Sequence, residues 1–309
     1  MSNPNLRIVS LIPSGTEILA ALGLTDAIVG RSHECDYPPE IKDRPVCTQA
    51  RLNSEATSDQ INTDVKDLLQ SALSIYQIKT DVLEKLQPTH IVTQDQCDVC
   101  AVSLKDVEKA VATLTDSQPQ IISLQPNVLA DVWADIDSVA GKVGVDSLRL
   151  VEDLEARVKI CEQKTHGLSA MERPSVACIE WIDPLMAAAN WIPELVTLAG
   201  GQALFSVTGQ PSPQLTWETL VATNPDVIIF MPCGFDLNRT RTEAALVTQR
   251  PEWNNLHAVQ AGRVYITDGN SYFNRPGPRL VDSQEILAEI LHPEIFEYGY
   301  KGTGWEPLG

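Results

Sequence analysis

Residues 7–23 read RIVSLIPSGTEILAALG, and this stretch decides the fold class. Its first part, residues 7–12, is a short, apolar, β-branched run that predicts a buried strand. Residues 13–16 are typical of a turn that ends in a helix cap, and the apolar residues of 17–22 repeat at helical spacing until Gly23. The stretch therefore predicts a strand that leads directly into a helix.

The same alternation continues outward through the first half of the chain. Residues 27–30, 90–93 and 121–124 are further strand-like runs, and residues 65–74 and 81–86 have helical spacing. Strands separated by helices imply right-handed βαβ units and a mostly parallel sheet. The first half is therefore predicted to form one α/β lobe.

The second half repeats this layout after a helical middle. A helix is expected over 128–141, and a second one, from about 146 to 166, would be roughly 30 Å long, enough to span two lobes. The elements expected after it are strands at 175–179, 227–230 and 263–266, and helices at 193–198 and 280–291.

These elements predict an α/β protein with two Rossmann-like parallel-sheet lobes bridged by one long α-helix. The predicted N-terminal lobe covers residues 1–126, the helical segment covers 127–171, and the C-terminal lobe with its tail covers 172–309. The tail from Pro293 to Gly309 carries glycines and aromatics without periodicity, and we expect irregular chain there.

Composition excludes several classes of function. The 309 residues include 23 Lys and Arg against 41 Asp and Glu, and the net charge of −18 argues against nucleic-acid binding. No apolar stretch approaches the roughly 18–20 residues of a membrane helix, so membrane insertion is not expected. No signal peptide is recognised before the first strand. The seven cysteines are sparse and odd in number, which favours reduced thiols over a disulfide scaffold. The sequence thus predicts a cytoplasmic protein.

Candidate ligand-binding residues follow the predicted strands, because ligands of parallel sheets bind beyond the carboxyl ends of the strands. Aromatic side chains concentrate in these loops of the second half. This concentration favours the binding of a flat ligand over a purely structural role, in which the rings would only cover the end of the lobe. Arg275 precedes a rigid Pro-Gly-Pro turn that would aim its guanidinium. The candidates are Ser14, His33, Glu34, Gln94, Trp181, Trp191, Phe235, Tyr272, Phe273 and Arg275.

Several separated motifs carry a family resemblance from about residue 6 to 291. They are PSGTEILAALG at 13–23, VGRS at 29–32, DYPP at 36–39, LQP at 86–88, LAGG at 198–201 and NPD at 224–226. In these motifs the chain resembles the class III substrate-binding proteins of cobalamin and iron-siderophore importers, and the cobalamin branch most of all. The resemblance implies two lobes joined by one helix, limited hinge motion, and one large ligand, a corrinoid such as cobalamin or a related tetrapyrrole or metal chelate.

Two departures from that family alter the expected partner. Relatives carry an acidic residue on each lobe that docks on a permease, whereas the matching stretches, 100–102 and 188–191, hold no carboxylate. The pocket aromatics expected after the second and fourth strands are replaced by Glu34 and Gln94. We therefore expect a small-molecule ligand but no docking on a permease, and a cytosolic carrier, sensor or enzyme remains open.

A metal site is the alternative hypothesis. Cys97 and Cys100 form a CxxC pair, and together with His33 and Cys35 they would complete a tetrahedral zinc or iron site. A single CxxC is weak evidence, and side chains at i and i+2 on an extended loop diverge. His33 could instead be an axial ligand to the cobalt or iron of a tetrapyrrole. The alternative function is a cytosolic metal-binding protein or metalloenzyme.

Motifs of catalysis are missing. The sequence holds no G-x-S-x-G, P-loop, dinucleotide fingerprint or HExxH. Ser14 follows a strand directly but lacks the flanking glycines of a nucleophile elbow. Binding is therefore the predicted activity, and no enzyme is expected.

Overall fold

The structure, a computed structural model, describes residues 6–70, 75–95 and 102–309. It divides into two compact units. The first consists of Met1–Ala56, Gln60–Pro126 and Ala130–Glu152, and the second of Thr57–Asp59, Asn127–Leu129 and Asp153–Gly309. The division falls inside a long helix, so the predicted boundaries at 126/127 and 171/172 stay a prediction.

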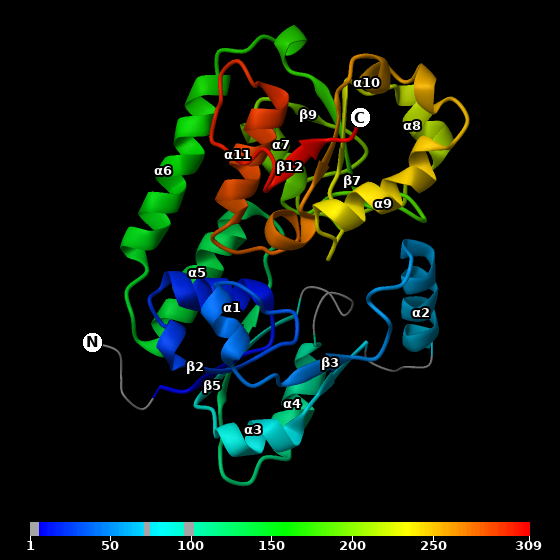
Figure 1. The fold of residues 1–309 in the computed structure, drawn as a ribbon. Helices are drawn as coiled ribbons and strands as arrows, with labels where there is room; N and C mark the ends of the chain where they lie inside the picture. Colours follow the sequence, from blue (N-terminus) through cyan, green and yellow to red (C-terminus); the bar gives the residue numbers. More distant parts are fainter. Residues whose placement is uncertain (1–5, 71–74, 96–101) are drawn as a thin grey trace. The chain divides into compact units, whose positions relative to one another are not determined.

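The first unit is built on a parallel sheet of four strands (Figure 1) in the order β2-β1-β5-β6. The strands are β1 (Ile8–Ser10), β2 (Ile28–Arg31), β5 (His90–Gln94) and β6 (Gln120–Leu124). β1 is buried throughout, which explains its apolar Ile8 and Val9, and Ser10 is buried with them. The helices of this part of the chain include α1 (Pro13–Ala21), α3 (Thr80–Leu86), α4 (Leu104–Ala112) and α5 (Leu129–Val143).

Helix α1 begins earlier than the sequence predicts. Pro13 is already helical, so the expected turn at 13–16 is wrong, because proline has the backbone angle of a first helical turn and needs no N–H there. Gly15 lies against β5, where an added Cβ would be 2.6 Å from Val92 Cγ1. The glycine therefore allows α1 to pack closely on the sheet.

A small antiparallel ribbon of the first unit was not predicted. It pairs β3 (Thr48–Ala50) with β4 (Tyr76–Ile78). Helix α2 (Ser58–Gln70) lies between these strands in the sequence and begins before the predicted 65–74. Strands of three residues are too short to show a period in the sequence. The ribbon matters because it carries Thr48 and Tyr76.

The second unit has a six-stranded mixed sheet in the order β12-β11-β10-β7-β8, with β9 also paired to β7. The strands are β7 (Ser175–Trp181), β8 (Met186–Ala187), β9 (Gln202–Ala203), β10 (Val227–Phe230), β11 (Val264–Thr267) and β12 (Trp305–Pro307). The helices are α7 (Ile192–Leu198), α8 (Trp217–Thr223), α9 (Leu237–Thr248), α10 (His257–Gln260) and α11 (Leu280–Leu291). β7, β10 and β11 are parallel, as predicted; β9 is a further parallel strand that was not predicted, and β8 and β12 are antiparallel additions.

The C-terminal tail is not irregular throughout, and that expectation is wrong. Its strand β12 pairs with β11, and buried Glu289 of α11 holds the preceding turn. The Glu289 carboxylate accepts hydrogen bonds from the backbone N–H groups of Gly299 and Tyr300 and, at 2.9 Å, from Trp305 Nε1. Long-range pairing of this kind leaves no periodic pattern in three residues of sequence.

The long helix expected near 146–166 is present as α6 (Leu148–Thr165). Its 18 residues span about 27 Å, and the boundary between the two units lies within it. In the second unit, Arg157 fixes α6 to α11 by donating to Glu285 Oε2 and Asp282 Oδ1, each at 2.6 Å. In the described residues, every helix is either too short or too polar to traverse a lipid bilayer.

Candidate functional site

The second unit presents an aromatic pair at the carboxyl edge of its sheet. Trp181 ends β7, and Phe235 lies in the segment that follows the neighbouring strand β10. Because the two strands are parallel, both segments begin at the same edge. The ring centroids are 5.5 Å apart with an interplanar angle of 53°. Trp181 Nε1 donates to Asp183 O at 3.1 Å, which fixes the orientation of the indole.

Arg239 adds a positive charge to this pair. Its guanidinium carbon lies 3.7 Å from the centre of the Phe235 ring, a cation–π contact. Asp236 caps α9 by accepting the backbone N–H of Arg239 at 2.8 Å, which places residue 239 in the first turn. Trp181, Phe235 and Arg239 are called the aromatic cluster below. Sequence analysis missed Arg239, although Asp236 as a helix cap and the i, i+4 spacing from Phe235 were the available signals.

The segment after β11 is fixed against the segment after β10. Asn270 N donates to Phe235 O at 3.1 Å, and Asn274 Nδ2 donates to Met231 O at 3.1 Å. At Gly269 an added Cβ would lie 2.3 Å from Pro232 O, so only glycine allows this approach. The loops that carry the predicted residues therefore form one hydrogen-bonded body.

Four other candidates lie in or near this body, mostly as buried side chains. Phe273 is fully buried, and Trp191 is 6% exposed and donates through Nε1 to Phe273 O at 3.0 Å. Arg275, 4% exposed, donates to Asn270 Oδ1 at 3.0 Å. Tyr272 is half-buried, with its ring edge-on to Tyr300. Rings as buried as Phe273 and Trp191 act as supports here, and their contact with a ligand stays a prediction.

The first unit places His33 on the β3–β4 ribbon side of its sheet. The backbone N–H of His33 donates to Thr48 Oγ1 at 3.0 Å, and His33 Nδ1 lies 2.8 Å from the same hydroxyl. The fully buried Thr48 hydroxyl therefore engages both the backbone N–H and Nδ1 of His33, and Nε2 is the ring nitrogen that Thr48 does not contact. Burial, followed by the charges of Lys79 and Arg31, lowers the pKa of His33 and keeps the ring neutral.

Glu34 lies beside this ring. Tyr76 Oη donates to Glu34 Oε1 at 3.1 Å, and the Glu34 backbone N–H donates to Ser32 Oγ at 3.1 Å. His33 Nε2 is 3.9 Å from Glu34 Oε1, and the His33 and Tyr76 ring centroids are 5.5 Å apart. Glu34 stands where the family resemblance predicts an aromatic residue, and the aromatic ring beside it is that of Tyr76, on β4. His33, Glu34 and Tyr76 are called the polar cluster.

The remaining candidates of the first unit are buried. The thiol of Cys35 is enclosed, with Sγ 3.8 Å from Ser10 O, and Gln94 is 2% exposed at the end of β5. Ser14 Oγ is buried without a hydrogen-bond partner. Cys97 and Cys100 lie outside the described residues. Among the residues that are described, no three His, Cys, Asp or Glu side chains come together as a metal site would need, so the zinc or iron site stays a prediction.

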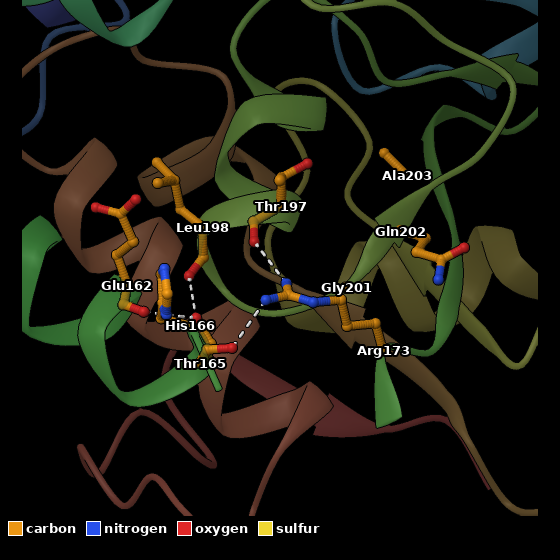
Figure 2. A pocket seen from close by; sticks show the side chains of 9 residues that line it. All are labelled: Glu162, Thr165, His166, Arg173, Thr197, Leu198, Gly201, Gln202 and Ala203. Carbon is orange, nitrogen blue, oxygen red and sulfur yellow. Dashed lines mark hydrogen bonds between the residues drawn. The ribbon is translucent and has the colours of Figure 1, made fainter. Parts of the chain in front are cut away.

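A pocket of about 500 Å³ lies elsewhere in the second unit (Figure 2). It adjoins the start of β7, about 20 Å along the strand from Trp181. Arg173 occupies it and donates to the last-turn carbonyls of two helices, Thr165 O at 2.8 Å and Thr197 O at 3.5 Å. A cation there neutralises the negative ends of both helices. This arrangement supports the fold and lies at the wrong edge for the predicted ligand.

Comparison with known proteins agrees with this geometry. Residues 8–270 match the family model described as periplasmic binding protein. The chain belongs to this family. It is 27% identical over 301 residues to an uncharacterized ABC transporter substrate-binding lipoprotein, YvrC of Bacillus subtilis, covering 94% of this chain and 81% of that protein.

Two further relatives extend the comparison. A vitamin B12-binding protein of Vibrio cholerae is 24% identical over 294 residues, covering 93% of this chain and 90% of that one. The periplasmic heme-binding protein RhuT from Roseiflexus, in apo form, superposes with a TM-score of 0.69 at 20% identity, covering 93% of this chain and 98% of that chain. The predicted family and the class III fold are thereby confirmed, and the named relatives are binding proteins.

Proposed function

We propose that this protein binds a corrinoid of the cobalamin type. The observation that carries the proposal is the aromatic cluster, in which the half-buried Trp181 ring and the Arg239 guanidinium, both supported by the buried Phe235 ring, meet at the carboxyl edge of the second sheet. Aromatic rings bind flat conjugated molecules through large contact areas, and guanidinium binds phosphate and amide oxygens. A corrinoid offers all three groups, since it has a conjugated ring, amide side chains and one phosphate.

The relatives support the same ligand class. The Vibrio cholerae relative, named a vitamin B12-binding protein, aligns along 93% of this chain. The likeness to a heme-binding protein supports only the fold, at 20% identity. A small organic molecule is therefore the proposed ligand, with heme and ferric chelates as the competitors to test.

His33 is proposed to act as a hydrogen-bond donor and not as an axial metal ligand. The proposal takes Thr48 Oγ1 as the donor to Nδ1, 2.8 Å away, and in that tautomer Nε2 carries the proton and offers no lone pair to cobalt or iron. Bound cobalamin would then keep its own lower base. An absorption spectrum of an imidazole-ligated corrinoid would contradict this assignment.

The prediction that no permease docks loses part of its support. It rested on stretches without carboxylates, yet Ala188, Ala189 and Trp191 are buried and could present no docking group in any case. The other stretch begins at Cys100, outside the described residues. The cytoplasmic location also stays a prediction.

The proposal is tested by titration of the purified protein with cyanocobalamin, hemin and a ferric hydroxamate. We expect saturable quenching of tryptophan fluorescence by cyanocobalamin, with the visible spectrum of the corrinoid recorded in parallel. Cobinamide, which lacks the phosphate-bearing nucleotide, is the matched ligand control and should bind more weakly. Failure of cyanocobalamin to give any saturable change at about 50 μM would overturn the proposal.

The metal alternative is tested on the same preparation. Zinc, iron, copper and cobalt are measured, and thiols are counted before and after chelation. A stoichiometric metal that is lost in Cys97→Ser would establish ligation by that loop.

A further inference from the structure

We propose that Asn270 donates its side-chain amide N–H to an oxygen of the ligand, and that Arg275 is the positioning residue that fixes the orientation of this amide. The inference rests on the proposed function for the identity of the ligand. It adds one directional contact to the ring surface of the aromatic cluster. The accepting oxygen belongs to an amide of the corrin ring or to the phosphate, and the binding of cobinamide distinguishes the two.

The first observation is the place of Asn270 in the fold. It lies in the segment after β11, at the carboxyl edge of the second sheet, where ligands of parallel sheets bind. Its backbone N–H donates to Phe235 O at 3.1 Å. The preceding residue, Gly269, passes so close to Pro232 O that an added Cβ would lie 2.3 Å from it. The main chain at residue 270 is therefore fixed beside the aromatic cluster.

The second observation is that the amide of Asn270 has only one possible orientation. Arg275, 4% exposed, donates from Nη2 to Asn270 Oδ1 at 3.0 Å. A guanidinium has donors only, and the amide nitrogen of asparagine does not accept, so Arg275 pairs with Oδ1 and not with Nδ2. The contact removes the usual ambiguity between the two ends of an asparagine amide. Nδ2 is therefore the arm that is left for another partner.

The third observation is that Nδ2 is available. Asn270 is half-buried, and within the described residues 6–70, 75–95 and 102–309 its Nδ2 has no acceptor and is not an enclosed atom. The carboxylate of the same loop, Asp268, instead accepts the backbone N–H of Ser271 at 2.7 Å. A donor whose direction is already fixed binds an oxygen without a further cost of ordering.

Such a donor supplies what ring surface does not. A ring contact accepts any flat conjugated molecule, whereas a hydrogen bond of fixed direction requires an oxygen at one position. A corrinoid carries amide oxygens around its ring and further oxygens on its phosphate. Asn270 therefore sets how the ligand is rotated against the aromatic cluster.

The experiment removes the donor and keeps the shape. Asn270→Asp has nearly the same size and still accepts from Arg275, but at pH 7 its second oxygen does not donate. Asn270→Ala removes the donor without adding a charge. Dissociation constants for cyanocobalamin and cobinamide are measured for the wild type and both variants.

Asn254→Asp is the matched control for the added charge. Asn254 is an exposed residue of the same unit and lies between α9 and α10. The nearby His257 contacts Asp226, directly before β10, with 3.2 Å between Nδ1 and Oδ1. The control therefore adds its charge at the amino edge of the sheet, away from Asn270.

We expect Asn270→Ala to weaken cyanocobalamin binding about 5-fold, through the lost hydrogen bond. Asn270→Asp should weaken it at least about 10-fold, because a carboxylate oxygen then faces the ligand oxygen. Asn254→Asp should stay within about 2-fold of the wild type. An equal loss with cobinamide assigns the accepting oxygen to a ring amide, and a loss confined to cyanocobalamin assigns it to the phosphate.

Two results would overturn the inference while the proposed function stands. One is an affinity within about 2-fold of the wild type in both variants of Asn270. The other is a loss in Asn270→Asp alone, which would assign the effect to the added charge. Melting temperatures without ligand establish that each variant is folded.

The role of Arg275 is tested by a double-variant cycle. Arg275→Gln should weaken cyanocobalamin binding about 3-fold in the wild type but less than about 1.5-fold in Asn270→Ala, where no amide is left to orient. Arg275→Lys, which keeps a donor, should recover part of the affinity, and it replaces Arg275→Gln in the cycle if that variant does not fold. A merely structural role would weaken binding by the same factor in both backgrounds, and that result would overturn the assignment of Arg275.

Failure of the proposed function is a separate outcome. If cyanocobalamin does not bind the wild type, the same variants of Asn270 are titrated with hemin and the ferric hydroxamate, which also carry oxygen acceptors. A loss of affinity in both variants would then support the inference, and equal affinity in all three proteins would overturn it. If none of the three ligands binds, the proposed function and the inference both fall.

Discussion

The two sheets end in different chemistry at their carboxyl edges. In the first unit β2 leads into His33 and Glu34 of the polar cluster, and in the second unit β7 and β10 lead into the aromatic cluster. In the second unit the loops are bonded to one another, as Asn270 N is to Phe235 O. In the first unit the β3–β4 ribbon supplies the support through Thr48 and Tyr76. The edge of the second sheet thus presents ring surface, whereas the edge of the first presents hydrogen-bonding groups.

The largest effect is expected from the supports of the second unit. Phe273→Ala should lower the free energy of unfolding by about 3–5 kcal/mol, because a fully buried ring is replaced by a cavity. Phe273→Leu, which keeps most of the apolar volume, should cost less than about 1.5 kcal/mol. Urea denaturation measures both variants. A loss below about 1 kcal/mol in Phe273→Ala would show that the loops after β10 and β11 are not held by this ring.

The next effect concerns Trp181, the half-buried ring of the aromatic cluster. Trp181→Ala should weaken cyanocobalamin binding by about 1–3 kcal/mol, while urea denaturation shows a folded protein. Trp217→Ala is the matched control, since Trp217 is a half-buried tryptophan of the same unit that stacks on Trp253. Titrations by absorbance compare the two variants. Equal weakening by both would mean that the aromatic cluster has no special role.

The contrast between the clusters also explains what could be read from the sequence. The strands and the rings that follow them were predictable, since buried parallel strands such as β10 are continuous apolar runs and Phe235 comes a few residues later. The sequence did not predict the roles of Thr48 and Tyr76, because these depend on contacts between segments far apart in the chain. It did not predict the role of Arg239 either, because that role depends on the cap of one helix. The burial of Phe273 and Trp191 could not be predicted either. An aromatic residue in a loop has the same sequence pattern whether its side chain faces solvent or the core.

A smaller effect is expected from Asp135, an acidic residue of α5. Burial raises the pKa of Asp135 to about 6, and Gln125 N, directly after β6, donates to Asp135 Oδ2 at 3.3 Å. The folded state therefore binds this proton more tightly than the unfolded state, so stability is lost as pH rises from about 4 to 6. Asp135→Asn should stabilise the protein by about 1–2 kcal/mol at pH 7, after allowance for solvent screening.

The same variant should be no more stable than the wild type near pH 4, where both side chains are neutral in the folded state. Urea denaturation at the two pH values measures the difference. A stability gain that is equal at both would assign it to packing and not to charge.

The smallest effect comes from the polar cluster itself. The pKa of His33 is lowered in the folded protein, by burial first and by Lys79 and Arg31 next, from a reference value of 6.5. Below about pH 6.5 the unfolded chain takes up this proton before the folded chain does, so the contribution of His33 to stability falls as pH decreases from 7 toward 5. His33→Asn keeps an amide group near Thr48 Oγ1 but does not titrate. The wild type should therefore lose stability relative to His33→Asn over this range, by less than about 1 kcal/mol. Parallel slopes for the two proteins would mean that His33 is as readily protonated as a free histidine.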